Sequence, residues 1–412
     1  MYTMELPPEI VRIILLAALK FVSPGCLLQV CRQWKDILLN EQNINPRRLH
    51  MSRITTLPQL MWVHAEGCPW NVRTCATIGK RGTLEMLQYA RDNECPWNWA
   101  TCAGAAKRGH LEMLQWAHAE GCPWDDRICT DAAEGGHFYV LRWARENGCP
   151  WGVGTCRAAA EGGYLGILQW ARVTGCKWNT WTCAGAAENG HLKVLKWAHK
   201  HACPWDSYTC NMAARNGHLE CLEWAYTNGC PWNSDTCAYA ARGGHLDIIQ
   251  WAREWLFTWD EETCAEAAFG GHLDVLQWVR ENGCPWTETT CTNAALTNHL
   301  EVLKWARENG CPWDIQTCVG AAKRGHLNVL KWAREHGCPW DEQITCAAAE
   351  RGYLHILCWA YANGCPLTKN TWCAALKGNH KNIVQWLRAN ELHTTGPYDV
   401  LQAYTESYMT CT

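Results

Sequence analysis

Apolar residues fall along this chain in two short patterns, both with helical spacing. In the first, typified by residues 101–106, small side chains recur at i, i+3 and i+4, the face a helix needs to lie close against its neighbours. In the second, Leu111, Leu114 and Ala117 share one face with Trp116 beside them, while Glu112 points outward. Two helices of about ten residues cannot bury enough surface alone, so neighbouring pairs must stack.

The pair of patterns recurs every 27 residues, twelve times in all. A favoured N-cap residue, such as Asn98 or Asp125, precedes each first helix, and glycines such as Gly109 and Gly121 end the two helices. This regularity predicts an all-α solenoid of two-helix repeats. The clearest marker is a cysteine, usually followed by Pro-Trp, which stands at positions 68, 95, 122, 149, 176, 203, 230, 284, 311, 338 and 365, with Phe257 in the remaining slot.

The repeat resembles the ankyrin repeat. The resemblance is carried by Ala105-Ala106-Lys107-Arg108-Gly109-His110-Leu111, followed by Leu114 and by Gly121-Cys122. Ankyrin repeats are about 33 residues long, and the residues missing here fall where ankyrin repeats carry a projecting hairpin. The resemblance therefore implies an ankyrin-like helix stack without hairpin fingers.

Atypical segments flank the repeats. Trp62 occupies the tryptophan position of a half-repeat, and in the last repeat Asn379 replaces the turn glycine, as expected of an outer repeat with one solvated face. We expect a helical module in residues 1–40, a linker in 41–56, a capping half-repeat in 57–67, twelve repeats in 68–389, and a tail or cap in 390–412.

The first forty residues resemble an F-box. The motif reads Leu-Pro-Pro-Glu-Ile at residues 6–10, Ile-Ile-Leu at 13–15 and Val-Cys-Arg-Gln-Trp at 30–34, although the Ser-Pro turn at 23–24 lies later than in that family. The resemblance implies docking to a Skp-family adaptor of a cullin-RING ubiquitin ligase. A helical cap serving only the array is the alternative reading. The implied adaptor contacts are Leu6, Pro7, Ile10, Ile14 and Leu15.

Composition narrows the choice of partners and compartments. The 37 basic and 40 acidic residues leave a net charge of -3, so no global field attracts nucleic acid or an anionic membrane. Arg12 and Lys20 interrupt the first apolar run, which argues against a secretory signal. We therefore expect a cytoplasmic or nuclear monomer whose 28 cysteines are free thiols. The combination of an F-box-like motif with ankyrin-like repeats resembles proteins common in giant viruses and protists, and a viral protein would act in the host cell.

The repeated cysteines, histidines and tryptophans point to structure more than to chemistry. Cys122, Cys129 and His137 lack the close-paired spacing of a zinc site, and other repeats replace such residues with Phe257 or Thr345. The spacing of stacked helices argues against disulfides between equivalent cysteines, whereas cross-position pairs stay open. The tryptophans of the second helices lack a basic groove beside them, so we expect their rings to stack between repeats. We find no signature of catalytic residues, a metal or a cofactor.

Recognition is expected at positions that vary between repeats, because packing holds the others constant. The two residues after each N-cap vary most and lie on the first turn of each first helix. Ordinary solvent-facing positions would look the same, and the two readings stay open. The candidate target-binding residues are Trp99, Arg127, Trp181, Tyr208, Asp235, Glu262 and Gln316.

These features favour a non-enzymatic protein-binding adaptor. In the first hypothesis it is an F-box substrate receptor, whose repeats hold a target for ubiquitination. In the second it is an ankyrin-like scaffold or decoy without a ligase link. The identity of the target cannot be read from the residues.

Overall fold

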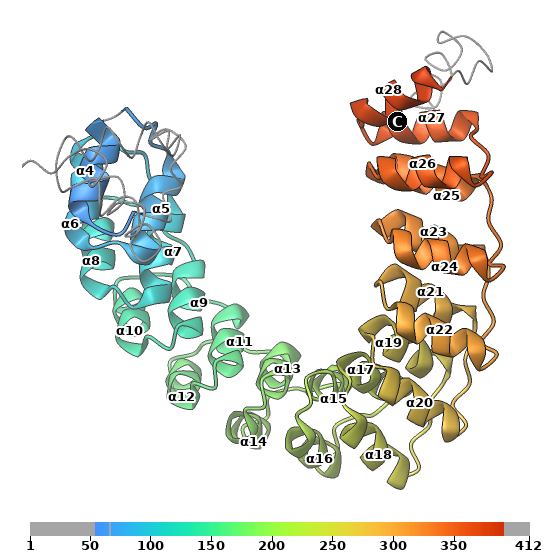
Figure 1. Ribbon diagram of the computed structural model, residues 1–412. Coiled ribbons are helices and arrows are strands. Elements are labelled where there is room, and N and C mark those ends of the chain that lie inside the picture. Colours follow the sequence, from blue (N-terminus) through green and yellow to red (C-terminus); the bar gives the residue numbers. More distant parts are fainter. Residues whose placement is uncertain (1–53, 66, 391–412) are drawn as a thin grey trace, which may run out of the picture. The chain divides into compact units, whose positions relative to one another are not determined.

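The computed structural model describes residues 54–65 and 67–390. Within them the chain forms 25 helices and no β-strand (Figure 1). Helices follow one another in pairs with the 27-residue period of the sequence, and the predicted fold class, an all-α solenoid of two-helix repeats, is confirmed. By their internal contacts the residues divide into an N-terminal unit, 1–204, and a C-terminal unit, 205–412.

In the described residues of the N-terminal unit, a single helix, α4, is followed by five helix pairs. Its helices are α4 (Leu57–Ala65), α5 (Val72–Arg81), α6 (Leu84–Asp92), α7 (Trp99–Arg108), α8 (Leu111–Ala119), α9 (Arg127–Glu134), α10 (Phe138–Glu146), α11 (Val153–Glu161), α12 (Leu165–Val173), α13 (Thr180–Glu188) and α14 (Leu192–Lys200).

The C-terminal unit continues the same alternation of first and second helices. Its helices are α15 (Ser207–Arg215), α16 (Leu219–Thr227), α17 (Ser234–Gly243), α18 (Leu246–Glu254), α19 (Glu261–Gly270), α20 (Leu273–Glu281), α21 (Glu288–Leu296), α22 (Leu300–Glu308), α23 (Ile315–Arg324), α24 (Leu327–Glu335), α25 (Glu342–Arg351), α26 (Leu354–Ala362), α27 (Lys369–Lys377) and α28 (Lys381–Ala389).

First helices stack on first helices within each unit. Helix α7 contacts α5 and α9, and α19 contacts α17 and α21, whereas each second helix packs mainly on the first helix of its own repeat. Close stacking depends on small residues, because a Cβ atom at Gly79 would clash with the carbonyl oxygen of Thr101. Each unit thus has a continuous layer of first helices, as the small-residue pattern predicted.

The core lies between the two helices of a repeat and extends into the next repeat. In α8 the buried side chains are Met113, Leu114 and Ala117, and Leu114 is 0% exposed. Leu111, which the sequence pattern placed on the same face, is only half-buried because it begins the helix at the edge of the stack. The exposed Glu112 confirms the predicted outward face.

Helix ends follow the predicted chemistry with one shift. Gly109 and Gly121 both have φ of 76°, so glycine does end both helices in the left-handed region. Asp125 was expected to start its helix directly, but α9 begins at Arg127 and its N-cap is Asp126. The Asp125 carboxylate still accepts from the backbone N–H of Arg127 at 3.1 Å. Asp125 therefore still caps the helix, although it stands one residue before the N-cap position.

The sequence also predicted the capping half-repeat, the F-box-like motif and the tail that flank the repeats. Helix α4 covers most of the predicted half-repeat and contacts α6. The F-box-like motif in residues 1–40, with its five adaptor-contact residues, lies outside the described residues. So do residues 391–412 of the predicted tail, and the domain boundaries stay predictions.

Candidate protein-binding surface

The cysteine of each Cys-Pro-Trp loop fastens that loop to the preceding repeat. Cys149 Sγ donates to the carbonyl oxygen of Asp125 at 3.2 Å, and Cys365 Sγ donates to that of Asp341 at 3.0 Å. The accepting residue lies 24 positions earlier, just before the previous first helix. The buried thiols therefore hold the first turns of the first helices in place.

The second cysteine of each repeat lies beside the first of the next. A hydrogen bond between the Cys129 and Cys149 thiols, followed by burial, raises the pKa of Cys129. The same hydrogen bond lowers the pKa of Cys149. Both cysteines are free thiols, so this cross-position pair, which the sequence left open as a disulfide, is not bridged.

An arginine near the end of many second helices contacts both the backbone and the tryptophan of the following loop. The Arg91 guanidinium donates to the carbonyl oxygen of Cys95 at 2.5 Å and lies 4.2 Å from the centroid of the Trp97 ring. His118 takes the same position in the next repeat and stacks on Trp124 at 3.8 Å. The sequence analysis did not predict this contact between the second helix and the loop. Its signal was present, because a cationic or aromatic residue stands six positions before the loop tryptophan.

The tryptophan rings pair differently from our expectation. They were predicted to stack on one another along the second helices. Instead, Trp116 of a second helix meets Trp97 of the loop edge to face, at 5.9 Å and 62°. The same pairing joins Trp305 to Trp286 at 6.0 Å. Most tryptophans of the second helices are thus paired with a loop tryptophan 19 residues earlier, and Trp116 and Trp97 are both half-buried. Trp386 differs, because it meets Tyr361.

The repeated histidine bonds to the backbone of the preceding repeat. His191 Nε2 donates to the carbonyl oxygen of Glu161 at 3.0 Å, and its ring covers Gly163 of the preceding repeat. The imidazole therefore closes the seam between two repeats. Tyr164 covers Gly136 in the same way, which explains how tyrosine can replace histidine at this position.

The predicted target-binding residues lie on the first turns of first helices, three in the N-terminal unit and four in the C-terminal unit. Arg127, Trp181, Asp235, Glu262 and Gln316 are exposed, whereas Trp99 and Tyr208 are half-buried. Their turns are fixed by caps, since Asp206, Asp260 and Asp314 accept from the backbone N–H groups of Tyr208, Glu262 and Gln316. That any of them binds a target stays a prediction.

Two of these candidates touch each other. The Arg127 guanidinium lies 3.3 Å from the centroid of the Trp99 ring, and it also pairs with the Asp125 carboxylate at 2.5 Å. This contact explains why Trp99 is half-buried. Trp181 is flanked by Arg157, 5.1 Å from its ring, yet remains 43% exposed. The N-terminal unit therefore presents an aromatic and cationic first-helix surface.

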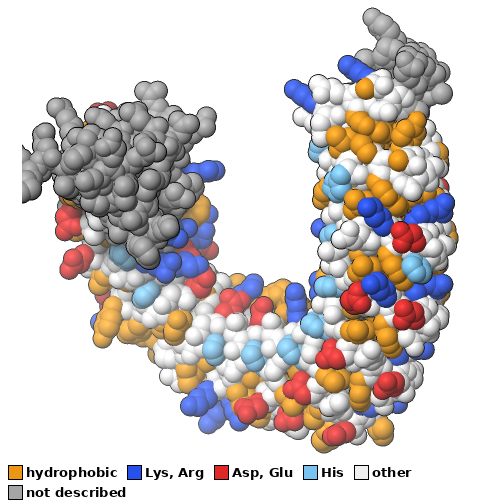
Figure 2. Space-filling view, in the orientation of Figure 1, with side chains coloured by type: hydrophobic (Ala, Val, Ile, Leu, Met, Phe, Trp, Pro, Cys, Tyr) orange, Lys and Arg blue, Asp and Glu red, His pale blue; other side chains and the backbone are white. Residues whose placement is uncertain are grey.

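The corresponding surface of the C-terminal unit is acidic. Burial, followed by repulsion from Glu266, raises the pKa of Glu262. Asp235 and Glu261 add further negative charge, while Glu266 is paired with Arg242 at 3.0 Å. On the face drawn in Figure 2, acidic and basic side chains are otherwise interspersed, in keeping with the small net charge.

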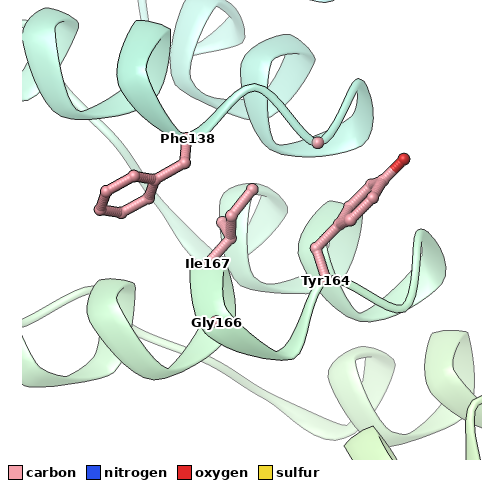
Figure 3. Close-up of a pocket in the computed structure, with 5 residues that line it drawn as sticks. Phe138, Tyr164, Gly166 and Ile167 are labelled. Carbon is pink, nitrogen blue, oxygen red and sulfur yellow. The ribbon is translucent and has the colours of Figure 1, made fainter.

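A shallow apolar notch opens on the other edge of the N-terminal unit (Figure 3). Its volume is about 320 Å³, and Phe138 and Tyr164 lie on either side of Ile167. Gly166 opens the notch because most other repeats carry a larger, charged residue at this position, and a Cβ atom there would meet nothing within 4 Å. Sequence comparison between repeats could have found this departure.

The described residues show no further candidate chemistry. Among residues 54–65 and 67–390, no three His, Cys, Asp or Glu side chains are grouped so that they could hold a metal ion. In the same part of the chain, no helix is both long and apolar enough to cross a membrane.

Comparisons with known proteins assign no family. No family model matches the sequence, and no curated protein matches it. Among solved structures, the human ASB11 ankyrin repeat domain is similar over 37% of this chain and 82% of its own, with 17% identity and a TM-score of 0.32. The maize pentatricopeptide repeat protein PPR10 is similar over 96% of this chain and 70% of its own, with 14% identity and a TM-score of 0.32. With TM-scores this low, neither structure supports a conclusion about this chain.

Proposed function

We propose that this protein is a non-enzymatic adaptor that binds another protein through its first helices. The observation that carries the proposal is the contrast within each repeat. Loop cysteines, caps and glycines recur in most repeats and hold the frame, whereas the exposed first-turn residues change from repeat to repeat. A surface that varies on a constant frame is what a repeat protein needs to specify one partner.

The chemistry of the two surfaces suggests what the target presents. Trp181 and the Trp99–Arg127 pair favour aromatic or acidic groups on the target, since exposed aromatic and arginine side chains dominate many interfaces. Asp235 and Glu262 favour basic groups.

We further propose that the adaptor is an F-box substrate receptor acting in the cytoplasm or nucleus. This part rests on the sequence of residues 1–40 alone, in which Leu6, Pro7, Ile10, Ile14 and Leu15 match the contact positions of the F-box pattern. The repeats would then hold the target while a Skp-family adaptor binds the N-terminal module.

The ligase link is tested by co-purification of a Skp-family adaptor with the full chain. We expect the adaptor to co-purify with the wild type and with an Asn43→Ala control, and to be lost with the Leu6→Ala/Pro7→Ala double variant. Absence of the adaptor from the wild type would leave the scaffold or decoy, which binds a target without changing its turnover.

Target binding is tested separately by affinity capture with quantitative mass spectrometry. A triple variant, Arg127→Ser/Trp181→Ser/Asp235→Ser, should lose specific partners at least about tenfold, because loss of central interface side chains typically costs more than 1 kcal/mol each. The matched control, Glu112→Ser/Lys193→Ser/Asp274→Ser, changes three exposed residues of second helices and should keep them. Equal retention by both variants would contradict a first-helix binding surface.

A further inference from the structure

The loop after α18 departs from its counterparts in other repeats. Most other second helices are followed by a polar residue and glycine, as at Asn282 and Gly283, and the exceptions, Glu94 and Ala202, replace only the glycine. Here Trp255 and Leu256 take those places and are 55% and 81% exposed. We call this pair the Trp255–Leu256 knob.

The knob is costly to the chain that carries it. Leu256 has φ of 58°, in the left-handed region that costs a side chain with a Cβ atom about 1 kcal/mol. Leaving a leucine in water also forgoes about 2 kcal/mol of apolar burial. Exposed, strained apolar residues of this kind are typical of contact sites, where another molecule supplies the missing burial.

A rigid aromatic base holds the knob in place. Phe257 replaces the usual cysteine and stacks on Trp232 at 4.2 Å and 15°, and Tyr226 meets Phe257 edge to face at 4.8 Å. The Trp255 ring packs against the same base, 6.2 Å from Trp251. A pre-ordered contact loses little conformational entropy on binding.

The two residues that precede the knob carry opposite charges, so this patch is complementary to a second copy of itself. Arg253 and Glu254 are neighbours, both exposed, and neither has an ion-pair partner within residues 54–65 and 67–390. In five other repeats the equivalent arginine donates to the loop carbonyl four residues on. Within the described residues Arg253 instead makes a ring contact, 4.8 Å from the Trp259 centroid. A two-fold axis through the knob would bring Arg253 of one copy opposite Glu254 of the other.

We propose that the knob binds a second copy of this chain about such an axis. Trp255 and Leu256 of the two copies form the apolar centre, and two Arg253–Glu254 pairs form the rim. Two-fold contacts of one patch with itself are the commonest way in which proteins associate. Because the patch is small, association is weak, with a dissociation constant of about 10–500 µM. This proposal departs from the monomer expected from the sequence and does not depend on the proposed target.

Analytical ultracentrifugation of the full chain between about 1 and 500 µM tests the apolar centre. The wild type should shift from monomer to dimer with rising concentration. The Trp255→Asn/Leu256→Gly variant restores the residues of other repeats, so it keeps the fold and should stay monomeric. Val173→Glu, which removes another highly exposed apolar side chain, should dimerise like the wild type. A monomeric wild type, or a knob variant that dimerises, overturns the proposal.

Charge reversal tests the two-fold arrangement. Glu254→Arg places like charges across the axis and should weaken dimerisation about tenfold. The double variant Arg253→Glu/Glu254→Arg re-creates both pairs and should restore wild-type affinity. Reversal without effect, or a double variant weaker than the single one, excludes this arrangement.

Discussion

Gly271 and Gly283 have nearly the same backbone conformation but different surroundings. Their φ angles are 80° and 84°, both left-handed. A Cβ atom at Gly271 would collide with the His299 ring of the next repeat, whereas one at Gly283 would meet nothing within 4 Å. The first glycine is thus required by the backbone and by the seam between repeats, the second by the backbone alone.

Alanine at each of these positions separates the two effects. Gly283→Ala should lower the free energy of unfolding by about 1 kcal/mol through backbone strain. Gly271→Ala should cost a further 1–3 kcal/mol or so, because the His299 ring must move. Urea unfolding of both variants measures the difference, and equal midpoints would mean that the seam adapts to a methyl group without loss.

At the scale of the element, the turn between the two helices of a repeat is a joint between repeats. His299 is half-buried there. Burial, followed by repulsion from His272, lowers the pKa of His299 below its usual 6.5. As the pH falls, the unfolded chain therefore takes up a proton before the folded one does. Stability from this joint is complete above pH 6.5 and is lost as the pH falls through the folded pKa.

His299→Tyr tests this dependence, because Tyr164 and Tyr353 occupy the same position in other repeats. Thermal unfolding at pH 8 reports any change in packing, since histidine is then neutral in both states. Between pH 8 and pH 5.5 the wild type should lose more melting temperature than the variant does. Identical losses would show that His299 contributes nothing to acid sensitivity.

The whole molecule keeps most of its thiols away from solvent. Of the cysteines in the described residues, only Cys68, Cys346, Cys358 and Cys373 are partly exposed. The other described cysteines are buried, and loop thiols such as Cys149 donate to carbonyl oxygens. Both features suit a neutral, reduced thiol.

Titration with a thiol reagent tests this assignment. Without reductant, the folded protein should react at few sites, and the unfolded protein should react at all 28. A metal chelator should not change its melting temperature. A deficit of thiols after unfolding would reveal disulfides, and stoichiometric zinc would contradict the structural role of the cysteines.

Within one repeat, the sequence alone was sufficient to predict where the helices begin and end. The positions of Asn98, Gly109 and Gly121 predicted the helix ends, because capping and left-handed glycine act over a few neighbouring residues. The departure at Asp125 amounts to one residue and leaves its hydrogen bond in place. The 27-residue period and the small first-helix residues likewise predicted the stack of helix pairs.

Contacts between side chains of different segments required the tertiary structure. The tryptophans of the second helices and those of the loops recur with the same 27-residue period, so the sequence does not specify which of them pair. Only the folded chain shows that Trp116 pairs with Trp97. Likewise, the sequence could name Trp99 as variable but not reveal that Arg127, from the next repeat, covers it. Periodicity specifies which residues of different repeats are equivalent. The exposure of a side chain depends instead on how neighbouring repeats approach it, and this is why Trp99 is half-buried whereas Leu256 is exposed.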